Sequence, residues 1–194
     1  MELTAKTLAH PKVRLEPFEE RHRKGLTEAA EADLSIFEHM PFPIDKQGYS
    51  FWFDLMLQEK AAGKWIPYAV IAPNGKIVGQ SCFMHIRPAD AGVEIGATWY
   101  ARAAQGTAIN PAAKFLLLDH AFACGAERVD FKTDERNARS RAALLKLGAR
   151  FEGIFLRHMR RRDGTLRDSA YYSIIREEWP SVRQRIETRI AALN

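Results

Sequence analysis

The chain has 194 residues, of which 46% are hydrophobic, and its 29 basic and 24 acidic residues give a formal net charge of +5. A chain of this size can bury one good core, so we expect a single domain over residues 1–194. No apolar run is long enough to span a bilayer, and no charged-then-apolar segment opens the chain. The sequence therefore predicts a cytoplasmic protein without a membrane partner.

The cysteines and histidines predict no metal site. Cys82 and Cys124 lie in apolar stretches without CxxC or Cys/His spacing, which is typical of buried thiols in a cytosolic protein. The six histidines are isolated from one another along the chain: His10, His22, His39, His85, His120 and His158. Isolated histidines are typical of surface or hydrogen-bonded core positions, so we expect no bound metal.

The first part of the chain predicts one strand and two helices. Residues 1–10 are expected to be a frayed start, and residues 13–17 alternate apolar and polar side chains as a short strand does. Residues 19–32 favour a helix, and residues 47–62 favour a second helix that Gly63 ends.

Three strands are predicted next. Residues 65–72 and 76–87 flank Pro73-Asn74-Gly75, which is a strong hairpin signal. The third strand covers residues 91–100, and its side chains are expected to alternate between two faces. The apolar face would carry Val93, Ile95, Ala97 and Trp99. The other face, small and polar at its start, would carry Glu94, Gly96, Thr98 and Tyr100.

A loop that lacks large side chains connects this strand to a helix. It reads Gln105-Gly106-Thr107-Ala108-Ile109. Asn110 and Pro111 follow as the expected N-cap and first residue of a helix that runs to Cys124. Exposed backbone N–H groups and the positive end of the helix dipole converge at such a junction. The sequence therefore predicts a pocket for a phosphorylated cofactor.

A second strand and helix follow the first pair. Residues 129–132 predict the strand, and Asn137 is expected to cap a helix that Gly148 ends. Ser140 falls in the first turn of that helix. Two interpretations stay open: Asn137 and Ser140 only shape the helix start, or their amide and hydroxyl groups lie beside the cofactor loop.

The last part of the chain predicts an arginine-rich hairpin and a final helix. Residues 150–162 and 166–175 flank Asp163-Gly164, and Pro180 begins the helix. The arginines favour a solvated hairpin, an acidic substrate or the phosphates of a cofactor. Aromatic side chains are not interleaved with them, so the pattern disfavours nucleic acid as a partner. Together the elements predict an α+β fold with mostly antiparallel strands and one strand-helix-strand unit.

These motifs resemble those of the GNAT N-acetyltransferases, and within that family the RimJ/RimL-like branch. The likeness covers most of the chain, and its most specific parts are Glu94-Ile95-Gly96, Gln105-Gly106-Thr107, Asn137-Ala138-Arg139-Ser140, Lys146-Leu147-Gly148-Ala149 and Asp163-Gly164. The resemblance implies a GNAT-like fold, a twisted and mostly antiparallel sheet of about seven strands flanked by helices. It also implies acetyl-CoA as co-substrate, held between two splayed strands at residues 93–100 and 129–132.

In the family the pyrophosphate binds a loop of pattern Arg/Gln-x-x-Gly-x-Gly/Ala. Gln105 matches its first position, whereas Ala108 and Asn110 occupy the two small-residue positions, and Asn110 departs from the pattern. The cofactor-binding residues that the resemblance implies are Ala97, Thr98, Trp99, Gln105, Gly106, Thr107, Ala108, Ile109, Asn110 and Asn137.

The resemblance also implies the catalytic residues. Glu94 would act as a base through water, unless it is an ordinary strand carboxylate paired with an arginine. Ser140 matches the serine of the family's Asn-x-x-Ser motif, which implies that it protonates the departing CoA sulfur, and the helix that Asn137 caps contains no tyrosine, the residue that many other family members use. Asn137 would hold the pantetheine or an ordered water. Main-chain N–H groups near Thr98 and Trp99 would stabilise the oxyanion.

The amine acceptor is expected between the first two helices and the arginine-rich hairpin. Aromatic side chains that could line this pocket, or lie in the core instead, are Phe42, Phe51, Trp52 and Phe53. The resemblance allows a protein N-terminal α-amine, a free amino acid, a polyamine or an amine antibiotic as acceptor. A non-catalytic acyl-CoA-binding module is the alternative of a different class. A homodimer through edge strands or the last helix is compatible with the pattern.

Overall fold

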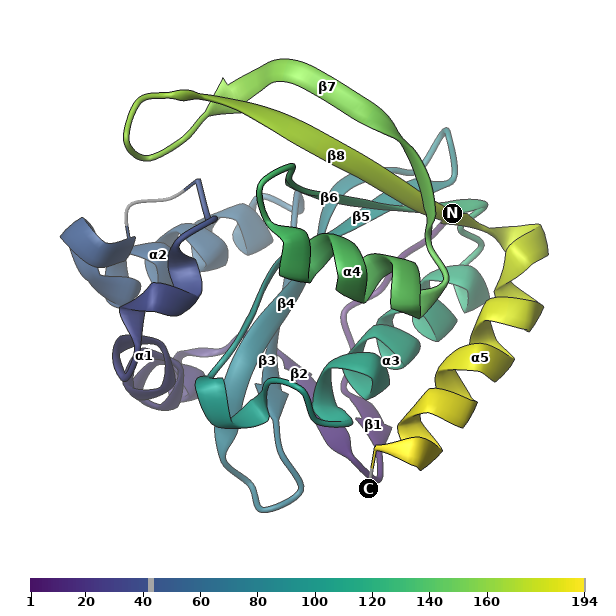
Figure 1. Ribbon diagram of the computed structural model, residues 1–194. Helices are drawn as coiled ribbons and strands as arrows, with labels where there is room; N and C mark the ends of the chain where they lie inside the picture. Colours follow the sequence, from purple (N-terminus) through teal and green to yellow (C-terminus); the bar gives the residue numbers. More distant parts are fainter. Residues whose placement is uncertain (42–43, 194) are drawn as a thin grey trace.

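The computed structural model describes residues 1–41 and 44–193. Its centre is an open eight-stranded sheet of order β1-β2-β3-β4-β5-β6-β8-β7 (Figure 1). The strands are β1 Leu8–His10, β2 Val13–Pro17, β3 Ile66–Ile71, β4 Ile77–Arg87, β5 Gly92–Tyr100, β6 Arg128–Asp134, β7 Arg150–Arg160 and β8 Leu166–Ile175. Neighbouring strands are antiparallel except β5 and β6, which are parallel. The expected α+β fold is confirmed, with one strand more than expected.

Helices cover both faces of the sheet. Their bounds are α1 Arg23–Glu31, α2 Ile44–Ala61, α3 Ile109–Ala123, α4 Ala138–Leu147 and α5 Trp179–Ala192. Figure 1 shows α1 and α2 at one side of the molecule and α3, α4 and α5 at the other. No helix in the described ranges is long and apolar enough to cross a membrane.

Each face of the sheet buries its own apolar cluster. One cluster joins α3 and α5 to the sheet, and it includes Leu118, Val93 and Ile186. The other cluster lies under α1 and α2 and contains Trp52 and Phe53, which are 1% and 0% exposed. Burial of a ring such as that of Phe53 contributes roughly 2–3 kcal/mol to stability. These two aromatic residues therefore belong to the core and do not line an acceptor pocket.

The two other aromatic residues expected at the acceptor pocket have different outcomes. Phe51 lies on the outer side of α2 and is 53% exposed. Phe42 lies outside the described residues. Helix α2 is interrupted at Gly48, where φ is +75°.

The first residues of the chain are ordered, so the expected frayed start is wrong. Leu8 is 7% exposed and pairs with Leu15 of β2. The backbone N–H of Glu2 donates to the carbonyl of Cys124 at 3.2 Å. A three-residue strand is too short for its alternation to be recognised, and burial of Leu8 is what fixes it.

Strand β5 contains a bulge at Ala97, where φ is +47°. Gln80 of β4 pairs with Trp99, whereas Cys82 pairs with Gly96, so two residues of β5 lie opposite one residue of β4. The bulge sends the Trp99 ring to the α1 and α2 side, away from the face that carries Val93. The expected single apolar face over residues 93–99 is therefore wrong beyond the bulge.

Strands β5 and β6 separate after a short stretch of pairing. Their paired residues are Gly92 with Arg128, Val93 with Val129 and Glu94 with Asp130. Beyond Glu94, β5 continues beside β4, and β6 continues beside β8. The two strands thus form the splayed pair that was expected, with Glu94 at its apex.

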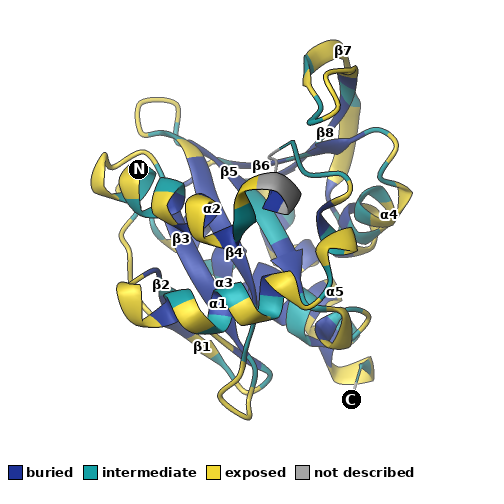
Figure 2. Cartoon of the chain, turned by 90° about the vertical axis from the view of Figure 1, so that its left-hand side faces the viewer, coloured by how far each residue is buried: buried dark blue, intermediate teal, exposed yellow. Residues whose placement is uncertain are grey.

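The β7–β8 hairpin projects beyond the rest of the sheet. Figure 2 shows it standing out from the helices, with much of β7 exposed. Only β8 continues the sheet inwards, where it pairs with β6. The hairpin therefore continues the sheet beyond β6, on the side of β6 that faces away from β5.

Candidate active site

Glu94 lies where the splayed strands part. The residue is 6% exposed, and its Oε2 is 3.4 Å from Nζ of Lys132 and 3.8 Å from Nε2 of His85. The expected alternative of an ordinary carboxylate paired with an arginine is thus not what the structure has. The carboxylate is held by a lysine of β6 and faces a histidine that is partly open to solvent.

Gly96 leaves the room that the Glu94 side chain uses. A Cβ atom at Gly96 would lie 3.0 Å from Oε1 of Glu94 and 3.0 Å from Sδ of Met84. A larger residue would therefore displace the carboxylate. The small residue at this position of β5 thus leaves room for the Glu94 side chain along its own strand.

Polar side chains of β6, β7 and β8 continue from Glu94 along the same face of the sheet. The Lys132 ammonium lies over the Tyr171 ring, 5.9 Å from its centroid. His158 accepts or donates through both ring nitrogens, at 3.1 Å to Ser169 Oγ and 3.3 Å to the Tyr171 hydroxyl. Burial, and then the nearby Lys132 cation, lowers the pKa of His158, so its ring is neutral at pH 7. This face can therefore exchange protons near Glu94.

Helix α3 begins two residues earlier than expected. Its N-cap is Ala108, and Asn110 lies in the first turn, so the expectation that Asn110 caps this helix is wrong. The Thr107 hydroxyl accepts the N–H of Ile109 at 3.3 Å. It thereby satisfies one of the backbone donors at the start of the helix, as the side chain of a capping Asn would. Pro111 is tolerated in the first turn because an N–H there has no intrahelical partner.

The loop before α3 presents backbone donors at the start of the helix. The N–H groups of Ala108 and Asn110 meet no acceptor in the ranges that the structure describes. They surround the positive end of the α3 dipole, where an anion is favoured. These donors fit a pyrophosphate, and they do so without a side-chain contribution from Asn110.

Gln105 acts within the loop. Its Nε2 donates to the Tyr100 carbonyl at 2.8 Å, and its Oε1 accepts from Nη1 of Arg139. The side chain predicted to bind the cofactor thus joins the loop to the start of α4. Arg139 is a residue that sequence reasoning missed, although it lies inside the Asn137–Ser140 motif. It places a guanidinium beside the unsatisfied N–H groups.

Asn137 and Ser140 meet at the start of α4. Oδ1 of Asn137 accepts the N–H of Ser140 at 2.9 Å, so the predicted cap is confirmed. The Asn137 amide nitrogen and the Ser140 hydroxyl have no hydrogen-bond partner among residues 1–41 and 44–193. Both groups can therefore serve a ligand while the cap stays in place.

Lys114 is a second residue that sequence reasoning missed. It is 7% exposed, and its Nζ donates to Thr98 Oγ1 at 2.8 Å and to Ser81 Oγ at 3.2 Å. Burial lowers its pKa to about 7. The lysine fixes the Thr98 side chain next to the bulge. Its sequence signal was a single cation inside the apolar stretch of α3.

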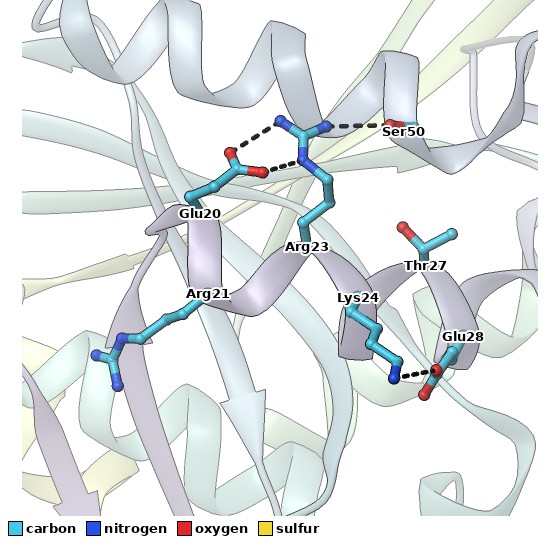
Figure 3. Close-up of a pocket in the computed structure, with 7 residues that line it drawn as sticks. All are labelled: Glu20, Arg21, Arg23, Lys24, Thr27, Glu28 and Ser50. Atoms are coloured by element: carbon cyan, nitrogen blue, oxygen red, sulfur yellow. Dashed lines mark hydrogen bonds and ion pairs between the residues drawn. The ribbon is translucent and has the colours of Figure 1, made fainter.

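Two hollows lie near the α1 and α2 side of the sheet. One, of about 300 Å³, lies between residues 38–41, the end of β6 and the β7–β8 turn, where the acceptor was expected. The other, of about 530 Å³, is an open depression on α1 (Figure 3). Its charges satisfy one another, since Arg23 binds Glu20 and lies 2.7 Å from Asp54. Only the first hollow adjoins the splayed strands.

Metal ligands do not gather in the described part of the chain. No group of three or more histidine, cysteine or acidic side chains there could hold an ion. Cys82 and Cys124 are both free, Cys82 buried as predicted and Cys124 half-buried.

Comparison with known proteins fits this geometry. The family model described as "Acetyltransferase (GNAT) domain" matches residues 12–150. This chain belongs to the GNAT acetyltransferase family. It is an N-acetyltransferase, as the resemblance of its motifs implied. No curated protein matches the sequence.

Solved GNAT structures superpose on nearly the whole chain. A GCN5-related N-acetyltransferase from Brucella melitensis is 28% identical, covers 96% of this chain over 86% of its own, and gives a TM-score of 0.88. RimJ from Mycobacterium smegmatis, in complex with CoA-disulfide, is 26% identical, covers 95% of this chain over 93% of its own, and gives a TM-score of 0.80. The RimJ neighbour agrees with the RimJ/RimL-like branch indicated by the sequence.

Proposed function

We propose that this GNAT enzyme transfers an acetyl group from acetyl-CoA to the N-terminal α-amine of a peptide or protein. The observation that carries the proposal is the position of Glu94, a buried carboxylate at the apex of the splayed strands. Its face of the sheet leads to the 300 Å³ hollow. The likeness to RimJ, whose structure holds a CoA-disulfide, supports both the co-substrate and the branch.

The residues present fit acetyl-CoA. Its pyrophosphate would be held by the N–H groups of Ala108 and Asn110 and by Arg139, and Asn137 would hold the pantetheine. When bound, acetyl-CoA supplies the acetyl group as an activated thioester. Main-chain N–H groups near Thr98 and Trp99 would face the oxyanion, and the Ser140 hydroxyl would hold a proton for the departing sulfur.

The acceptor amine must be neutral before it can attack. An α-amino group of pKa about 8 costs about 1.4 kcal/mol to deprotonate at pH 7, whereas a lysine of pKa about 10.4 costs about 4.6 kcal/mol. One carboxylate acting through water is therefore sufficient for an α-amine. Glu94 would take this proton, and the neutral His158 ring on the same face offers a route to solvent.

A thiol-release assay with a panel of amines tests the proposal. The panel contains short peptides with free N-termini, free amino acids and a polyamine, each incubated with acetyl-CoA. We expect release of CoA with the peptides at rates well above those with the other amines. Release with a small amine alone, or with none, would contradict the assignment.

Ser140→Ala is expected to lower kcat by about 10²-fold, because the proton for the departing sulfur is lost. The N–H of Ser140 still binds Asn137 in the variant, so the helix cap is kept. The KM for acetyl-CoA should stay near the wild-type value. Steady-state kinetics separate the two parameters, and a collapse of acetyl-CoA affinity would make Ser140 a binding residue instead.

Arg139→Ala is expected to raise the KM for acetyl-CoA by about tenfold with little change in kcat, since a hydrogen bond to a charged group contributes about 1.5–3 kcal/mol. Lys146→Ala, an exposed cation in the last turn of the same helix, is the matched control. Equal effects of the two substitutions would show only a loss of general positive charge and would remove Arg139 from the binding site.

A further inference from the structure

Arg167 is a buried cation without a hydrogen-bonded counter-ion. The residue lies on β8, is 4% exposed, and lines the hollow of about 300 Å³ beside the splayed strands. Its Nε makes no hydrogen bond within the described ranges, and the nearest carboxylate oxygen, Oδ2 of Asp134, is 3.9 Å away. A buried charge is costly unless it is paired and hydrogen-bonded. Arg167 therefore has unused capacity to bind an anion.

Asp134, the acidic residue nearest to Arg167, accepts its hydrogen bonds from two other arginines. Nε and Nη2 of Arg161 donate to its two oxygens at 2.7 and 3.1 Å, and the N–H of Arg136 donates at 2.9 Å. The side chain of Asp134 is 1% exposed. Its hydrogen bonds go to Arg161 and Arg136, whereas Arg167 lies beside it only at ion-pair distance, so the Arg167 guanidinium keeps donors for a further anion.

The walls of the hollow suit one carboxylate. Arg136, Arg161 and Arg162 line it together with Arg167. Asp163, at the hairpin turn, accepts the N–H of Thr165 at 2.9 Å and its hydroxyl at 2.6 Å, both on Oδ1. Glu38 is the remaining acidic lining residue, and it is exposed. A planar guanidinium in this setting can bind a carboxylate through two parallel hydrogen bonds.

We propose that Arg167 binds an acidic side chain of the acceptor peptide, a short distance behind the N-terminal amine that reacts near Glu94. This inference rests on the proposed function and adds a specificity to it. The enzyme then selects N-termini that carry aspartate or glutamate close to the first residue.

The register of the strands favours an acidic side chain over the carboxylate of a free amino acid. Glu94 is level with Asp130, which pairs with Ser173, and Arg167 lies six residues before Ser173 on β8. Six residues of a strand span about 20 Å, and the side chains of Glu94 and Arg167 cover part of this distance. The α-carboxylate carbon of a free amino acid is only two bonds from the amine nitrogen. An extended peptide, which advances about 3.3–3.6 Å per residue, covers the remaining distance with its second to fourth residues.

Paired peptides test the proposal. Each pair differs only in glutamate against glutamine at the second, third or fourth position, and kcat/KM is measured with saturating acetyl-CoA. In the wild-type enzyme we expect at least one position at which glutamate is favoured about tenfold or more. Arg167→Gln should bring that ratio close to one, and Arg167→Lys should keep part of it. The matched control is Arg160→Gln, an exposed arginine of the same hairpin, and it should keep the full ratio.

Several results would overturn the inference. A ratio near one at all positions in the wild-type enzyme would do so without any variant, so a failure of Arg167→Gln to fold does not block the test. An unchanged ratio in folded Arg167→Gln would also contradict it, as would a preference for free glutamate or aspartate over the acidic peptides. If no peptide is acetylated, the proposed function fails separately, and calorimetric binding of the glutamate and glutamine peptides still decides on Arg167.

Discussion

Glu94→Gln is expected to lower kcat/KM for an N-terminal peptide by about 10²-fold below pH 7, with a smaller loss as the pH rises above 8. The carboxylate removes a proton that the α-amine, of pKa about 8, still carries at low pH. Above that pH the amine is already neutral, and base assistance matters less. The measurement is a pH–rate profile of both proteins from pH 6 to 9.5.

The substitution keeps the shape of the side chain. Glutamine fits the space between Gly96 and Met84 that Glu94 fills, so packing is preserved. Glu152→Gln is the matched control, because that carboxylate binds Arg128 and Ser173 on an outer strand and should leave the profile unchanged. A parallel profile for Glu94→Gln and the wild-type enzyme would remove Glu94 as the base.

Lys114→Met is expected to raise the free energy of unfolding more at pH 7 than at high pH. The difference between the two effects should amount to several kcal/mol. Burial lowers the pKa of Lys114 from 10.5 to about 7 in the folded protein. Between these values the unfolded chain binds more protons than the folded one, so wild-type stability rises with pH. At 1.36 kcal/mol for each pH unit, the full difference amounts to about 5 kcal/mol. Methionine carries no charge and removes this dependence.

Urea unfolding at pH 7 and pH 9.5 measures the effect. The gain in stability on substitution should be larger at pH 7 than at pH 9.5 by about 3 kcal/mol. Burial raises the pKa of the Cys82 thiol, and this group opposes the trend at high pH in both proteins. Lys146→Met is the exposed control. A gain that is the same at both pH values would show that the folded protein does not depress the pKa of Lys114.

Features that depend on neighbouring residues in the chain were predictable from the sequence. Gly75 and Gly148 take φ values of +81° and +101°, as a hairpin turn and a helix end require. Asn137 caps α4, and the strand, loop and helix that surround the candidate site fall close to their expected positions. These signals are local because each depends on the backbone within one turn.

Features that depend on contacts between distant segments were not predictable. The bulge at Ala97 arises from the fit of β5 against β4, so alternation alone put Trp99 on the wrong face. Asn110 satisfied the propensity for a cap, but the hydroxyl of Thr107, three residues earlier, accepts a backbone N–H at the start of the helix instead. The roles of Lys114 and Arg167 follow from their burial against other strands. The sequence shows each only as a single cation and does not reveal that burial.

Transfer of acetyl to an N-terminal α-amine is tested most directly with two peptides that differ only at their first nitrogen. One has a free N-terminus and the other a formylated one, and both contain a single lysine. After incubation with acetyl-CoA, fragmentation by mass spectrometry locates the added acetyl group. We predict one acetyl group on the first residue of the free peptide and none on the blocked peptide. Acetylated lysine in the blocked peptide, with the free N-terminus unmodified, would contradict the account.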